Sequence, residues 1–115
     1  MGKLRNIQII AEFYGCDPEL ISRSDTVKKI INRAIRKSKL TKIRSHYHQF
    51  RPSGVTGVVL LAESHITMHS WPEYNYLALD LFSCGDKKKA KIAIEQLTKD
   101  FKPLKLKKQI VIRGL

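Results

Sequence analysis

The sequence predicts an α+β fold, a two-layer α/β sandwich in which a mainly antiparallel sheet carries helices on one face. Five segments are rich in β-branched and aromatic residues, and two others repeat apolar residues every three or four positions. Their order along the chain, β-α-β-β-β-α-β, is typical of such sandwiches. With 115 residues and no repeat or linker, the chain is expected to form one domain over residues 1–115.

The first strand is predicted over residues 7–16, which are β-branched and aromatic and end in a glycine break. Asp17-Pro18 is a turn signal. A helix follows over about 26–38, with Asp25 as its N-terminal cap. Lysines and arginines fill much of this helix, which is typical of a solvated face. Its opposite face is apolar through Val27, Ile30, Ile31, Ala34 and Ile35.

The rest of the chain supplies four more strands and a second helix. The continuous apolar run over 55–62 predicts a strand buried on both sides. The helix is expected over 87–99, with Ala90, Ala93, Ile94 and Leu97 on one face. The other three strands are predicted over 40–50, 74–82 and 104–113.

Charge is the unusual feature of the composition. Lys and Arg number 22 against 10 Asp and Glu, a net charge of +12, which suggests a polyanion partner such as nucleic acid or an acidic membrane surface. Residues 64–85, however, contain no Lys or Arg. The chain has no apolar run of membrane-spanning length and no signal-peptide pattern. We therefore expect a cytoplasmic protein with free thiols at Cys16 and Cys84.

The segment 54–85 gathers the side chains that could carry chemistry. His65 and His69 have the spacing of a helical zinc motif, but the segment is β-rich and offers no third ligand, so no metal is expected. A hydrolase triad of Ser64, His69 and Glu73 would lack the Gly-x-Ser-x-Gly elbow. A pyridoxal enzyme needs a Schiff-base lysine, and the segment has none.

Ser64 offers a further chemistry, because its hydroxyl can attack the carbonyl of Glu63 if that peptide bond is strained and an oxyanion donor is near. The amide then becomes an ester, a base removes the Ser64 α-proton, and the ester is eliminated. The dehydroalanine that remains hydrolyses to a pyruvoyl group. This electrophilic ketone needs no external cofactor.

Three motifs surround this serine: Glu63-Ser64-His65, Met68-His-Ser-Trp-Pro-Glu73 and Phe82-Ser-Cys-Gly85. Together with Gly54-Val-Thr-Gly57 and Ala11-Glu-Phe-Tyr-Gly-Cys-Asp17, they closely resemble the prokaryotic S-adenosylmethionine decarboxylase proenzymes, which are pyruvoyl enzymes of polyamine synthesis. The resemblance covers most of the chain. It implies self-cleavage between Glu63 and Ser64 into a β chain, 1–63, and an α chain, 64–115.

The resemblance also implies the roles of individual residues. In self-processing, the Thr56 hydroxyl would stabilise the oxyanion and His69 would take the α-proton, as an imidazole can near neutral pH. In turnover, the pyruvoyl group made from Ser64, with neither pyridoxal phosphate nor metal, would form a Schiff base with the substrate amine and accept the electrons left by CO2. Cys84 would be the general acid. The implied substrate contacts are Glu73 to ribose hydroxyls, and Phe50 and Trp71 to the adenine or the sulfonium.

The activity so implied is decarboxylation of S-adenosylmethionine, which supplies the aminopropyl donor for spermidine. The resemblance also implies a homodimer, or a dimer of processed protomers, with sites shared across the interface. Related enzymes of this fold use the same self-cleavage and the same electron sink to decarboxylate L-arginine or L-ornithine. This sequence departs from the family pattern at Gln8, at Asp86-Lys-Lys-Lys and at the early C-terminus, so these two substrates remain as the alternative. The alternative of another class is a basic nucleic-acid-binding module without catalysis, although no arginine-rich tail or interleaved aromatic stripe supports it.

Overall fold

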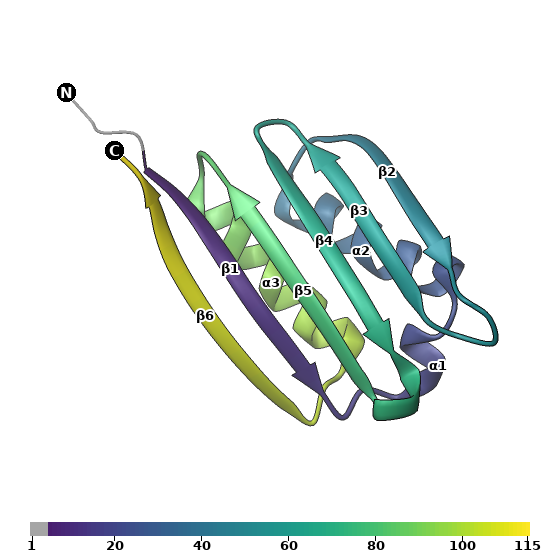
Figure 1. Cartoon of the computed structure of the whole chain (residues 1–115). Coiled ribbons are helices and arrows are strands. Elements are labelled where there is room, and N and C mark those ends of the chain that lie inside the picture. The colour runs from purple at the N-terminus through teal and green to yellow at the C-terminus, as the bar shows by residue number, and fades with distance from the viewer. Residues whose placement is uncertain (1–4) are drawn as a thin grey trace.

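The structure, a computed structural model, describes residues 5–115, whose strands form one antiparallel sheet (Figure 1). The six strands lie in the order β2-β3-β4-β5-β1-β6, so β1 is a central strand and the last strand, β6, is at an edge. Their bounds are β1 Arg5–Tyr14, β2 Lys42–Gln49, β3 Val55–Leu61, β4 Ser64–Trp71, β5 Tyr76–Ser83 and β6 Lys105–Gly114.

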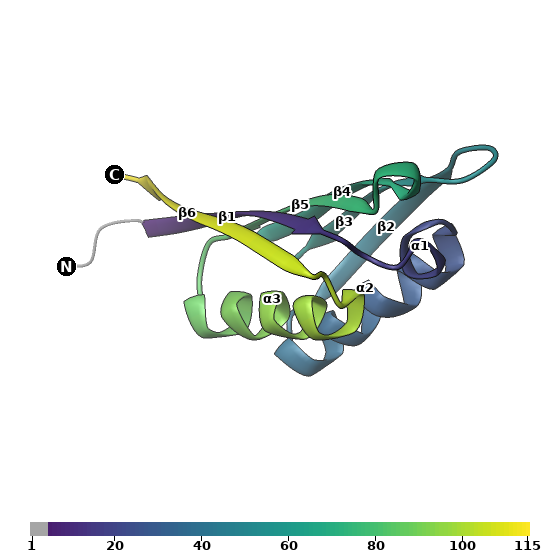
Figure 2. The same cartoon turned by 90° about the horizontal axis from the view of Figure 1, so that it is seen from below.

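Three α-helices of the described chain cover one face of the sheet and leave the other face open (Figure 2). They are α1 (Pro18–Ile21), α2 (Ser24–Ser38) and α3 (Lys87–Phe101), and a short 3-10 helix, η1 (Pro72–Tyr74), joins β4 to β5. The Asp86 carboxylate starts α3 by accepting a hydrogen bond from the backbone N–H of Lys88 at 2.8 Å. No helix within residues 5–115 has the length and apolar character needed to span a membrane.

The core lies between the sheet and the helices. Alternate residues of each strand turn toward the helices, because side chains in a strand alternate between its two faces. On β1 the inward residues are Ile7, Ile9, Ala11 and Phe13, all buried. The apolar faces of α2 and α3 meet them, and the ring centroid of Phe13 lies 5.9 Å from that of Phe101. The isoleucine and phenylalanine side chains among these each contribute roughly 1.5–3 kcal/mol when fully buried.

The predicted fold class is confirmed, and the structure adds one strand to the predicted order. Strand β4 pairs with both β3 and β5, so four consecutive strands follow the first helices. The hydrophobic pattern of β4 is weak, because two of its four inward residues are the serines Ser64 and Ser70 and only Ile66 and Met68 are apolar. Hydrophobic periodicity therefore could not separate this strand from a loop.

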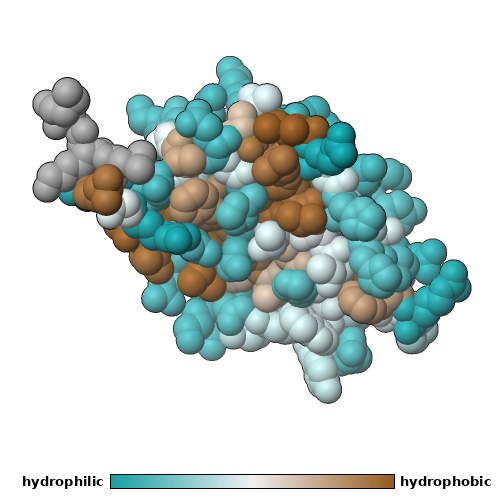
Figure 3. Space-filling view, turned by 45° about the horizontal axis from the view of Figure 1, so that its top comes forward, coloured by the Kyte–Doolittle hydropathy of each residue, from teal (hydrophilic) through white to brown (hydrophobic). Residues whose placement is uncertain are grey.

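The two faces of the molecule differ in character. On the open face of the sheet, Val58 and Leu60 of β3 are 45% and 51% exposed. Figure 3 shows such apolar patches within a mainly hydrophilic surface. The lysines and arginines of α2 lie on its solvent side, as the sequence predicts, with Lys28, Arg36 and Lys37 all exposed.

Candidate functional site

The residues singled out from the sequence fall into two groups at opposite ends of β4. One group surrounds the turn between β3 and β4, at the top of Figure 1, and contains Ser64. The other surrounds the far end of β4 and contains His69. Ser64 and His69 are five residue steps apart along the strand, a distance of about 16 Å at the usual rise of a strand. A single chain therefore does not bring Ser64 and His69 together, although both lie in the segment 54–85.

The first group is built around the peptide bond between Glu63 and Ser64. Only Ala62 and Glu63 link β3 to β4, and the turn holds Glu63 in the left-handed region at φ 61°. This region costs a residue other than glycine roughly 1–2 kcal/mol. The Cys84 thiol, at the end of β5, donates a hydrogen bond to the Glu63 carbonyl oxygen. The residue before the bond predicted to be cleaved therefore has a strained backbone conformation, and the carbonyl of that bond is polarised.

A cavity of about 220 Å³ adjoins this bond. Ser64 itself is only 8% exposed, while Cys84 is half-buried. The cavity is not free of lysine, although residues 64–85 are: the side chain of Lys89, from the first turn of α3, also lines it. Its full lining is Leu40, Thr41, Ala62, Glu63, Ser64, Ser83, Cys84, Gly85, Asp86 and Lys89.

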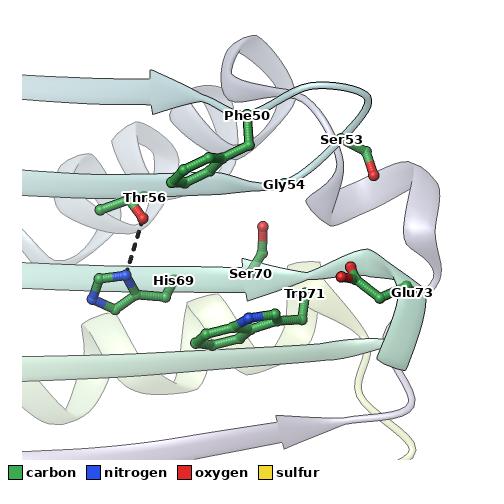
Figure 4. A pocket seen from close by; sticks show the side chains of 8 residues that line it. All are labelled: Phe50, Ser53, Gly54, Thr56, His69, Ser70, Trp71 and Glu73. Atoms are coloured by element: carbon green, nitrogen blue, oxygen red, sulfur yellow. Dashed lines mark hydrogen bonds between the residues drawn. The ribbon is translucent and has the colours of Figure 1, made fainter.

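The second group lines a larger cavity, of about 380 Å³, between the loop after β2 and the end of β4. Figure 4 shows the rings of Phe50 and Trp71 on opposite sides of it, with the Glu73 carboxylate at one end. At the other end, Thr56 Oγ1 and His69 Nδ1 are 3.0 Å apart, because the two residues are direct cross-strand partners. The structure thus brings together all five of these sequence-predicted residues, but at a distance from Ser64.

Aromatic rings continue from this cavity across the open face of the sheet. Trp71 stacks on Tyr76, with ring centroids 5.4 Å apart and planes 18° apart. Tyr76 stacks in turn on Tyr14 at 5.4 Å. The Tyr76 hydroxyl donates to the Glu12 carboxylate, and burial together with this acceptor raises the pKa of Tyr76 well above its usual value. Since Trp71 is 40% exposed, its free side offers a flat apolar wall to a ligand.

Sequence reasoning missed the side chain that fixes the loop of Phe50. The Gln49 amide group donates to the carbonyl oxygens of Ser22 and Phe50 at 2.9 Å and of Gly54 at 3.0 Å, and its oxygen accepts from the Ser24 N–H at 2.6 Å. It therefore ties the loop to the junction of α1 and α2. A long amide at the end of a strand, directly before a turn, was the available signal.

The histidines and cysteines give no sign of a metal site. His65 and His69 lie on the same face of β4 but four residues of extended chain apart, and His65 stacks on Phe82 with ring centroids 5.5 Å apart. Among residues 5–115, no three His, Cys, Asp or Glu side chains gather as metal ligands would. Cys16 and Cys84 are free thiols, and burial raises the pKa of Cys16 to about 11.

Comparison with known proteins identifies what this arrangement is similar to. Residues 7–114 match the family model described as S-adenosylmethionine decarboxylase. The S-adenosylmethionine decarboxylase proenzyme of Thermoplasma volcanium is 50% identical over 108 residues, which cover 94% of this chain and 83% of that protein. The proenzyme of Aquifex aeolicus is 42% identical over 115 residues, which cover 100% of this chain and 85% of that protein.

A solved structure gives the same answer for the fold. The crystal structure of the adenosylmethionine decarboxylase from Aquifex aeolicus superposes with a TM-score of 0.94 at 39% sequence identity, over 99% of this chain and 94% of that one. Sequence and fold therefore agree over nearly the whole length. The chain belongs to the S-adenosylmethionine decarboxylase family.

Proposed function

We propose that this chain is a self-processing S-adenosylmethionine decarboxylase whose catalytic pyruvoyl group forms from Ser64. The observation that carries the proposal is the state of the Glu63–Ser64 peptide bond. Glu63 is held at φ 61°, and its carbonyl accepts a hydrogen bond from the Cys84 thiol. The backbone strain at Glu63 raises the energy of the uncut turn, and a donor on the carbonyl stabilises the oxyanion that attack would form.

Cleavage follows from this geometry by steps that need no added reagent except water. Ser64 Oγ attacks the Glu63 carbonyl carbon, the C–N bond breaks, and Glu63 becomes an ester on Ser64 with a free amine beside it. A base removes the Ser64 α-proton, the Cβ–Oγ bond breaks, and Glu63 leaves as a carboxylate. Water then replaces the nitrogen, which leaves as ammonia. The products are a chain of residues 1–63 and a chain of residues 64–115 that begins with a ketone.

The residues beside Ser64 fit such a ketone. A pyruvoyl group supplies an electron sink for the pair of electrons left when CO2 departs. Cys84 lines the same cavity as Ser64, which supports its role as the acid that returns a proton to the substrate carbon. The site needs no pyridoxal phosphate and no metal for this chemistry.

The second group of residues has the chemistry to bind the rest of S-adenosylmethionine. Its cavity is lined by Phe50 and Trp71, whose rings suit a flat purine or a cationic sulfonium. The Glu73 carboxylate can accept hydrogen bonds from two ribose hydroxyls. In the tautomer in which His69 Nδ1–H donates to Thr56 Oγ1, the Nε2 atom has a lone pair that can take the Ser64 α-proton.

The two groups come together if the working unit is a homodimer. About 16 Å separates Ser64 from His69 along one β4 strand, so neither His69 nor Thr56 can serve Ser64 of the same chain. Two copies packed through their open sheet faces, with a two-fold axis and antiparallel β4 strands, would bring the Ser64 end of each to the His69 end of the other. The half-exposed Val58 and Leu60 on that face support such packing.

Mass spectrometry of the purified protein tests cleavage, and a CO2-release assay tests the substrate. We expect chains of residues 1–63 and 64–115, the second lacking a free amine, and no cleavage in Ser64→Ala. CO2 should be released from S-adenosylmethionine and not from L-arginine or L-ornithine measured in parallel. A wild-type protein that stays at full length would refute self-processing. Release of CO2 from L-arginine or L-ornithine alone would refute S-adenosylmethionine as the substrate.

The shared site is tested by mixing two inactive variants. Ser64→Ala lacks the source of the ketone, and Glu73→Gln lacks the carboxylate of the second group. Co-expression should restore activity, because one of the two sites in a mixed dimer then has both groups intact. If each site lies within one chain, the mixed dimer contains no complete site and stays inactive.

A further inference from the structure

The cavity beside the Glu63–Ser64 bond is lined by a single cationic side chain, Lys89. Lys89 lies in the first turn of α3 and is half-buried, whereas Lys88 and Lys91 on the same helix are exposed. The helix thus turns one of its lysines toward the bond that the proposed self-processing cleaves.

The uncut chain gives this ammonium group no carboxylate partner. The Asp86 carboxylate lines the same cavity but caps α3 through the Lys88 N–H. Within the part of the chain that the structure describes, the one ion pair joins Arg33 and Asp100, at 3.4 Å. Lys89 is therefore a half-buried cation that forms no ion pair with residues 5–115 before cleavage, although the Asp86 carboxylate lines the same cavity.

Cleavage would supply an ion-pair partner in the same cavity. When the Glu63–Ser64 bond breaks, the Glu63 carbonyl becomes a carboxylate, which adds one negative charge beside Lys89. We propose that Lys89 is the binding site for this new C-terminal carboxylate, an inference that rests on the proposed self-processing. The ion pair forms in a half-buried cavity, where solvent screens charges less than it does at the surface.

Such a pair would have two effects on the processed enzyme. It would hold the end of the 1–63 chain beside α3. It would also engage the Lys89 ammonium group, so that this side chain is held by the carboxylate and kept from the ketone of residue 64 in the same cavity.

The test compares one substitution in two forms of the protein. Lys89→Met is made in the wild-type chain, which cleaves, and in Ser64→Ala, which does not, and Tm is measured at one protein concentration. We expect Lys89→Met to lower the Tm of the processed protein by about 3 °C or more beyond its effect in the Ser64→Ala background. Lys89→Arg should keep the wild-type Tm. Lys91→Met, on the exposed side of α3, should act equally in both backgrounds.

Each other outcome bears on a definite part of the proposal. Equal losses of Tm in the two backgrounds would mean that Lys89 is merely structural and would overturn its role. A wild-type protein that never cleaves would refute the self-processing and this site with it. A borohydride treatment without substrate gives an independent measurement: we expect no cross-link, and a reduced bond between Lys89 and residue 64 would show that the amine is not held by the carboxylate.

Discussion

Thr56 Oγ1 lies 3.0 Å from Nδ1 of His69, across the ladder between β3 and β4. This contact fixes the plane of the imidazole, and when Nδ1–H donates to Thr56 it leaves Nε2 as the nitrogen that accepts a proton. A base held in one orientation needs less reorganisation when it takes a proton. The contact therefore links an ordinary strand threonine to the proposed chemistry of self-processing.

Thr56→Val should slow self-processing by tenfold or more, since it keeps the shape of the side chain but removes the hydroxyl. Thr56→Ser keeps the hydroxyl and should process at close to the wild-type rate. The time course of conversion from full-length protein to the two product chains, followed on gels, measures the effect. Equal rates for Val and Ser would show that the hydroxyl plays no part.

Cys84→Ser should separate the two roles proposed for this thiol. A serine hydroxyl can still donate to the Glu63 carbonyl, so cleavage should continue, but it is a far weaker acid than a thiol. The rate of CO2 release by the cleaved variant should fall by about 10²-fold or more. Cys84→Ala, which loses the donor as well, should also cleave more slowly. If the serine variant turns over at the wild-type rate, Cys84 is not the general acid.

Gly57→Ala should destabilise the protein by about 1–3 kcal/mol, because the added methyl group has no room. A Cβ at this position would lie 2.6 Å from the Tyr47 ring and 3.2 Å from the Met68 sulfur. Urea denaturation measures the loss. Combining Gly57→Ala with Tyr47→Leu should cost less than the sum of the two single changes, since the smaller side chain gives up the contested space. Strict additivity would mean that the ring is not what the methyl group meets.

Tyr47→Phe should leave stability unchanged at pH 7 or raise it by up to about 1 kcal/mol. The Tyr47 hydroxyl is buried without a hydrogen-bond partner among the described residues, and burial raises the pKa of Tyr47 from 10.0 to about 12. Between pH 10 and 12 the unfolded chain releases this proton and the folded chain keeps it, so wild-type stability falls as pH rises. Tyr47→Phe should show less of that fall in denaturation curves recorded at pH 8 and pH 11, and an identical fall would refute the shift.

The elements with strong hydrophobic patterns could be predicted closely from the sequence. The helix expected over 87–99 is α3, Lys87–Phe101, because its apolar face repeats at the helical period. Strand β4 could not be predicted, since the serines that face inward on it are held by hydrogen bonds instead of hydrophobic contacts. Ser70 Oγ accepts a hydrogen bond from the Val55 N–H and donates one to the Ile21 carbonyl. Hydrophobic periodicity in the sequence does not reveal such hydrogen bonds.

The site could be predicted only in part, because it depends on the same strand, β4. The motifs predicted which residues form the site, and the structure gathers Phe50, Thr56, His69, Trp71 and Glu73 around one cavity. Their distance from Ser64 followed only once residues 64–71 were known to be extended. Lys89 was hidden for a different reason: it lies outside the lysine-free segment and reaches the cavity through the turn of α3. Sequence proximity is a poor guide to spatial proximity at the two ends of a strand.

The two-residue turn at Ala62 and Glu63 joins neighbouring strands whose other partners, β2 and β5, are already in place. The proposed cut there would leave the strands of the sheet paired, so the mature protein would keep its shape while becoming two molecules. Unfolding then separates the halves, and refolding becomes a second-order encounter that dilution slows. Maturation at this turn would therefore make even the refolding of a single protomer depend on protein concentration, whereas an uncut protomer refolds as one chain.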